Sequence, residues 1–140
     1  MARAIIETAE YLIPMAKKAK VPVCVHHDHG LTFEKCMEAL KLGFTSVMYD
    51  CSTETYEENA EKVAQMVKIC HAMGVTVEGE LGHVGDNAVA VGNAHGDYAF
   101  PPKLDFDRIS TISEKTGLPL VLHGGSGLSD DDFKEAVERP

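Results

Sequence analysis

Three apolar segments of this chain each end in a histidine that is followed by glycine. The segments are VPVCVHHDHG (21–30), NAVAVGNAHG (87–96) and LPLVLHGG (118–125), which reach His29-Gly30, His95-Gly96 and His123-Gly124. Short apolar runs with a glycine boundary are typical of strands buried on both faces of a parallel sheet. The repeat predicts a sheet that carries one imidazole at the end of each of three strands.

Helix and strand signals alternate along the rest of the chain. Each predicted helix has a capping residue or an apolar stripe at helical spacing, and each predicted strand is a short apolar run. The helices are 32–43, 55–74, 104–117 and 129–140, and the further strands are 44–50 and 75–82. Strict alternation predicts an α/β fold with a parallel sheet, and we expect a (β/α)8 TIM barrel represented by about five strands.

Three features depart from a complete barrel. The helical pattern at 5–19 runs through Pro14, which should break or kink a helix, so we expect two helices whose intervening strand is absent. Residues 82–88 are too few for a parallel crossover, and a full barrel has about 250 residues. We therefore expect one partial barrel domain over 1–140, lacking segments before residue 21, between 82 and 88, and after 140. The purified protein should exceed 15.2 kDa.

Composition narrows the range of partners. The formal charge of −9 and the pI of about 5.1 argue against nucleic-acid binding, because a basic surface is needed to neutralise phosphates. A small anion would need a local binding device such as a metal or backbone N–H groups. No apolar run reaches the roughly 20 residues that span a bilayer, and the N-terminus has no signal-peptide core. Four cysteines without CxxC spacing predict reduced thiols in a cytoplasmic protein.

The strand-end histidines suggest a metal centre. A catalytic zinc site commonly has three protein ligands and one open position, and we expect His29, His95 and His123 to supply them. The alternative is that each histidine bonds neighbouring backbone. Asp28 could act as general base beside the cation or orient a histidine. Asp28 and His29 would face opposite sides of an ideal strand, so both reach one site only if the chain turns after His27.

Further polar residues lie at the same predicted edge of the sheet. Asp50 and Glu80 end two strands, where they could form another metal position, hold the ligands in place or cap a loop. The glycines of HGGSG (123–127) let backbone N–H groups approach an anion, which predicts a phosphate nest at Gly124, Gly125 and Ser126. No role is assigned to His26, His27 or His83.

These segments together resemble the class II, zinc-dependent ketose-bisphosphate aldolases, which include fructose- and tagatose-bisphosphate aldolase. The resemblance is carried by VHHDHG, SVMYDCS, VEGELGHVG, GNAHGDYAFPPKLDF and LPLVLHGGSGL. It implies a TIM barrel with one catalytic Zn²⁺ bound by histidines 29, 95 and 123, and proton transfer by Asp28. It implies that Asp50 and Glu80 offer a second or alternative metal position, which could hold a divalent or monovalent cation. The residues implied for substrate phosphate are Gly96, Gly124, Gly125 and Ser126.

The resemblance also implies an activity, which is aldol cleavage of a ketose 1,6-bisphosphate to dihydroxyacetone phosphate and an aldehyde phosphate. It implies a cytoplasmic homodimer or homotetramer. No lysine ends a predicted strand, which favours a metal route over a Schiff base. Ala99 stands where the family often has a basic residue, and the acidic loop after GELGHVG is missing, so we expect the isolated 140-residue chain to be inactive. The alternatives are a zinc-dependent barrel hydrolase, suggested by His27-x-His29, and a non-catalytic barrel that serves as a binding module.

Overall fold

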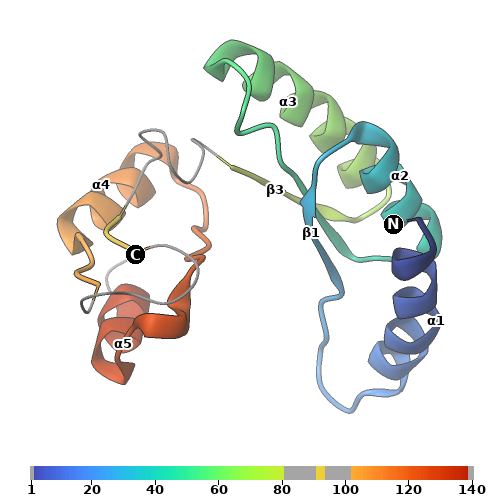
Figure 1. Cartoon of the computed structure of the whole chain (residues 1–140), viewed down its shortest axis with the longest axis horizontal. Coiled ribbons are helices and arrows are strands. Elements are labelled where there is room, and N and C mark those ends of the chain that lie inside the picture. Colours follow the sequence, from blue (N-terminus) through green and yellow to red (C-terminus); the bar gives the residue numbers. More distant parts are fainter. Residues whose placement is uncertain (1, 81–90, 94–101, 139–140) are drawn as a thin grey trace. The chain divides into compact units, whose positions relative to one another are not determined.

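The computed structural model describes residues 2–80, 91–93 and 102–138. They belong to two compact units, residues 1–83 and 84–140, and each is described by itself (Figure 1). The elements of the first unit are α1 (Ala2–Lys18), β1 (His26–Gly30), α2 (Phe33–Leu42), β2 (Ser46–Tyr49), α3 (Tyr56–Ala72) and β3 (Thr76–Gly79). The second unit contains α4 (Phe106–Thr116), the 3-10 turn η1 (Gly125–Gly127) and α5 (Asp130–Glu138). Within the described ranges, every helix is too short or too polar to cross a bilayer.

A parallel sheet with the order β1-β2-β3 organises the first unit. Ser46 of β2 pairs with His26 of β1 on one side and with Thr76 of β3 on the other. Helix α2 packs on β1 and β2, and α3 packs on β3. Figure 1 shows both helices on the same side of the sheet. The unit is therefore a β-α-β-α-β arrangement, which is the repeating pattern of parallel α/β folds.

The two faces of this sheet differ in character. Side chains of a strand alternate between faces, and Val47 and Tyr49 join the apolar core under the helices. That core also contains Cys36, Leu40, Met66 and Cys70. The opposite face carries the polar side chains of His26, Ser46 and Glu78, which contact one another. We call it the polar face.

The helix ends follow the signals read from the sequence. Thr32 accepts a hydrogen bond from the backbone N–H of Lys35, and Gly43 ends α2 in a left-handed conformation. Thr55 and Glu58 form the complete capping box that begins α3. The Ser129 hydroxyl and the Asp132 carboxylate bond each other at the start of α5. These confirmed caps show that local side-chain chemistry fixes where the helices begin and end.

The prediction of two helices around Pro14 is wrong, because α1 is one continuous helix that contains Pro14. Proline lacks the N–H that would bond the carbonyl of Glu10, four residues earlier, and its ring crowds that carbonyl. Glu10 is exposed, so the weakened turn lies on the solvent side of the helix. The residues expected on the apolar face of α3 are Tyr56, Ala60, Val63, Val67 and Cys70. Of these, Cys70 is buried and Tyr56 is 67 % exposed, while the helix also buries Asn59 and Met66.

Two predicted strands differ from the structure. The first was expected to begin at Val21, but β1 begins at His26, and Val21 and Val23 are largely exposed. Residues 118–125 were expected to be a strand and are not one, because no described segment pairs with 118–124 and Gly125 belongs to η1. The strand predicted at 88–96 lies mostly outside the described residues, and 91–93 are not in a strand. All four cysteines are free thiols, as predicted, and burial raises the pKa of Cys36 to about 12.

Candidate functional site

A β-bulge at the end of β1 resolves the conflict between Asp28 and His29. His27 pairs with Val47 and Gly30 with Tyr49, so two residues of β1 stand opposite the single residue Met48. His29 has a φ of 49°, in the left-handed region. The extra residue turns the chain, and both Asp28 and His29 contact other residues of the polar face.

Close packing beside the bulge explains the glycine that follows His29. A Cβ atom on Gly30 would lie 2.5 Å from Cys36 Sγ and 2.7 Å from the carbonyl oxygen of Met48. The thiol of Cys36 also contacts two backbone carbonyl oxygens, those of Gly30 and Met48. Helix α2 therefore approaches the strand end at a point where only a residue without a side chain fits.

Three side chains meet where the strands end. His29 Nδ1 lies 2.8 Å from Asp50 Oδ2 and 3.5 Å from Glu80 Oε2. Asp50 follows β2 directly, and Glu80 follows β3. One possible ligand atom from each residue lies within 4.8 Å of the other two. An imidazole nitrogen and two carboxylate oxygens are donors that a divalent ion such as Zn²⁺ accepts, so this set fits a metal.

Hydrogen bonds hold the Asp50 carboxylate and the backbone at Glu80 in place. The Ser52 N–H donates to Asp50 Oδ1 over 3.0 Å, which leaves Oδ2 directed at His29. The Asn59 amide donates to the backbone carbonyl of Glu80 over 2.7 Å, and Asn59 is only 5 % exposed. The sequence reading missed Asn59. A polar residue on the buried side of a predicted helix is the signal that could have identified it.

The imidazole and the carboxylate shift each other's proton affinity. The hydrogen bond that His29 donates to the Asp50 carboxylate raises the pKa of His29 above its ordinary value, although partial burial opposes this effect. Burial alone would raise the pKa of Asp50, but hydrogen bonds from Ser52 and His29 outweigh it and the pKa is lowered. Asp50 is thus an ionised carboxylate beside His29, suited to orient its ring or to share a cation with it.

The other predicted site residues fall in different parts of the chain. Asp28 has a half-exposed side chain whose Oδ1 lies 3.9 Å from His26 Nε2. His123 belongs to the second unit, where its carbonyl accepts a hydrogen bond from the Asn93 amide. Gly124 and Gly125 are there too, and a Cβ on Gly125 would lie 2.6 Å from the Phe133 ring. Outside the described residues lie His95 and Gly96, and the side chain of Ser126 is not described.

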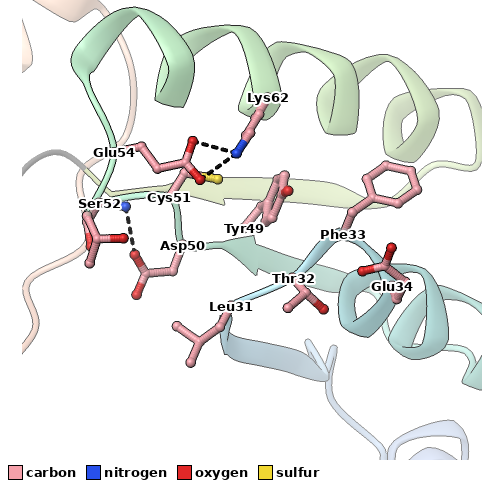
Figure 2. A pocket seen from close by; sticks show the side chains of 11 residues that line it. Leu31, Thr32, Phe33, Glu34, Tyr49, Asp50, Cys51, Ser52, Glu54 and Lys62 are labelled. Carbon is pink, nitrogen blue, oxygen red and sulfur yellow. Dashed lines mark hydrogen bonds and ion pairs between the residues drawn. The ribbon is translucent and has the colours of Figure 1, made fainter.

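A pocket adjoins Asp50 between the segments that follow β1 and β2 (Figure 2). Its lining includes Thr32, Tyr49 and Lys62. The Lys62 ammonium pairs with the Glu54 carboxylate, and this hydrogen bond raises the pKa of Lys62.

Known proteins are similar to this chain in both sequence and fold. The family described as "Fructose-bisphosphate aldolase class-II" matches residues 1–88 and 86–139. A fructose-bisphosphate aldolase of Staphylococcus epidermidis is 40 % identical over 146 residues, which cover 84 % of this chain and 51 % of that protein.

Two solved structures resemble the chain as well. The YdjI aldolase of Escherichia coli K12 has a TM-score of 0.86 and 35 % identity, over 97 % of this chain and 58 % of that one. A fructose-bisphosphate aldolase of Campylobacter jejuni has a TM-score of 0.70 and 25 % identity, over 99 % of this chain and 55 % of that one. The chain thus spans about half the length of the curated relatives it matches.

Proposed function

Because the chain belongs to the class II fructose-bisphosphate aldolase family, we propose that the protein carrying it cleaves a ketose 1,6-bisphosphate. The products are dihydroxyacetone phosphate and an aldehyde phosphate, with fructose or tagatose bisphosphate as the substrate class. The bulge at Asp28 and His29 is the observation that carries the proposal, since it brings a carboxylate and an imidazole to one face of the sheet.

We assign the proton transfer to Asp28. Its carboxylate accepts the proton of the substrate's C4 hydroxyl while the C3–C4 bond breaks, and in the condensation direction it returns this proton. Asp28 suits this role because its side chain is 57 % exposed, and so accessible to a substrate, near the end of β1.

We propose that His29, His95 and His123 hold one zinc ion. When bound, zinc supplies a Lewis acid that stabilises the negative charge left on the ketone side after cleavage. Asp50 orients the His29 ring through the 2.8 Å hydrogen bond. Asp50 and Glu80, which lie close to His29, also offer a second cation position.

The remaining parts of the proposal concern the substrate phosphate and the assembly. Gly96, Gly124, Gly125 and Ser126 bind a phosphate through backbone N–H groups and a hydroxyl. Gly124 supports this role with its left-handed conformation, φ 73°, which directs successive N–H groups to one side. We further propose a (β/α)8 barrel for the whole protein, which acts as a dimer or tetramer in the cytoplasm.

Metal-dependent cleavage tests the proposed function. The intact protein should release dihydroxyacetone phosphate from fructose or tagatose 1,6-bisphosphate, lose this activity with a chelator and regain it with Zn²⁺. His29→Ala should lose both bound zinc and activity. His71→Ala, which alters an exposed histidine in the last turn of α3, should lose neither.

The opposite outcomes are equally clear. Cleavage that survives complete removal of metal would refute the zinc mechanism. A zinc-loaded protein that hydrolyses amides or esters but cleaves no ketose bisphosphate would favour the hydrolase alternative.

A further inference from the structure

A second polar cluster lies deeper on the polar face, and the proposed chemistry leaves it without a role. The Nδ1 atom of His26 lies 2.7 Å from the hydroxyl of Ser46. Its Nε2 atom lies 3.5 Å from Glu78 Oε2 and 3.9 Å from Asp28 Oδ1. Ser46 is only 7 % exposed, and Nε2 of His26 is buried.

The sheet register fixes this cluster. His26 stands opposite Ser46 on the neighbouring strand, and Glu78 stands opposite Met48, two residues further along β2. Residues two apart on a strand share a face, so His26 and Asp28 project to the same side. The imidazole therefore lies between the partly buried carboxylate of Glu78 and the residue that we propose as the proton carrier.

Electrostatics decides which nitrogen of His26 carries a proton. A bare lone pair on Nε2 would face two carboxylate oxygens, which is unfavourable. Nε2 therefore carries a hydrogen, and in the neutral ring Nδ1 is then an acceptor that receives the hydroxyl proton of Ser46. Ser46 thus holds the ring in the orientation that directs Nε2–H toward the two acids.

We propose that His26 is a positioning residue for Asp28, an inference that rests on the proposed function. Its buried Nε2–H has no hydrogen bond among the described residues and lies 3.9 Å from one oxygen of the Asp28 carboxylate, so it attracts that oxygen electrostatically and limits the rotation of the carboxylate. The other oxygen is left to face the C4 hydroxyl of the substrate. A carboxylate on a half-exposed side chain would otherwise rotate among several orientations, of which only some can accept the proton.

Two substitutions separate this role from packing. In His26→Asn the amide can replace Nδ1 but does not reach the acids, whereas in His26→Gln it places an N–H near the former Nε2. In the intact, zinc-loaded protein, His26→Asn should lower kcat by roughly tenfold to a hundredfold, the usual cost of a misplaced catalytic group. KM and bound zinc should stay unchanged, and His26→Gln should recover most of kcat.

A kcat for His26→Asn equal to that of the wild type would overturn the inference. So would equal losses in both variants, because the N–H at the Nε2 position would then not matter. If either variant fails to fold, ¹⁵N NMR of histidine-labelled wild-type protein tests the inference instead, because it observes the His26 ring directly.

The NMR experiment does not depend on turnover. We expect Nε2 of His26 to be protonated and its ¹⁵N resonance to move in the Asp28→Asn variant. The control variant is Glu38→Gln, which alters a carboxylate on α2 and should leave this resonance unchanged. An unprotonated Nε2, or a resonance unaffected by Asp28→Asn, would overturn the inference. If the wild type cleaves no ketose bisphosphate, the proposed function fails, and these spectra still decide whether His26 binds Asp28.

Discussion

His29 combines a strained backbone with the proposed metal contact. A left-handed conformation costs an ordinary residue about 1–2 kcal/mol, whereas asparagine adopts it more readily. His29 has this conformation, with φ 49°. We expect His29→Asn to unfold with a free energy about 1 kcal/mol higher than that of His29→Ala. Urea denaturation of the two metal-free variants measures this difference, and zinc titration should show that both bind the ion weakly.

A helical histidine provides the matched control. At His71, which lies in α3, alanine should be the more stable replacement because it has the higher helix propensity. The difference in unfolding free energy between the asparagine and the alanine variant should therefore have opposite signs at His29 and at His71. The same sign at both would mean that the backbone of His29 is not strained in solution.

At the scale of single residues, the sequence predicted which residues lie at the edge of the sheet better than it predicted which way their side chains point. It placed Asp28, His29, Asp50 and Glu80 at the edge of the sheet, and it predicted that Asp28 and His29 need a turn of the chain. The form of that turn, one extra residue opposite Met48, depends on the pairing of two strands. The contact of Asn59 with Glu80 likewise joins residues 21 positions apart. Local periodicity contains no information about such pairs.

Helix α3 contains one residue that stabilises the helix itself, Thr55, and one that contacts the end of β3, Asn59. Substitutions can separate these two roles. Asn59→Ala removes the amide that bonds the Glu80 carbonyl and should cost about 1–3 kcal/mol of unfolding free energy, the cost of an unsatisfied buried group. It should also weaken cation binding at Asp50 and Glu80, because the end of β3 loses its anchor. Calorimetric titration of the intact protein with a divalent ion measures the second effect.

The capping residue of the same helix is the control. Thr55→Ala should cost about 0.5–2 kcal/mol of stability, as the loss of an N-cap usually does. It should leave the cation affinity unchanged, because Thr55 is exposed and contacts Glu58 rather than the strand ends. Equal losses of cation affinity in both variants would show that α3 acts on the site only through general stability.

At the scale of elements, prediction succeeded where the signal was local. The N-caps at Thr32 and Thr55 and the glycine after α2 come from side-chain and backbone chemistry within one helical turn. Prediction failed where the structure of an element depends on its exposure to solvent or on contacts with a distant segment. Pro14 lies within the continuous helix α1, where the turn that it weakens is at the exposed residue Glu10, and the buried side of α3 includes Asn59, which an apolar pattern omits.

At the scale of the whole molecule, alternation of strands and helices predicted the parallel α/β class, and three strands in the described residues follow it. The number of strands was less predictable. A strand forms only where a neighbour supplies hydrogen bonds, and residues 118–124 have no such neighbour in the part that the structure describes. Within the described residues their apolar side chains are also largely exposed, with Leu118 63 % and Val121 60 % exposed, so the apolar pattern alone predicted neither a strand nor burial.

One zinc ion shared by histidines of different segments should stabilise the whole protein. A ligand that binds only the folded state adds about 2.7 kcal/mol when present at a hundred times its Kd. Zinc should therefore raise the Tm of the intact, metal-free protein. His123→Ala should abolish this rise as completely as His29→Ala does, while His71→Ala should preserve it.

Differential scanning calorimetry with and without zinc makes this measurement, and it requires no substrate. A full zinc-dependent rise in His123→Ala would exclude His123 from the metal site. The ion would then be bound by His29 with Asp50 and Glu80, whose donor atoms already lie within 4.8 Å of one another. In that case Asp50→Asn, rather than His123→Ala, should remove the zinc effect.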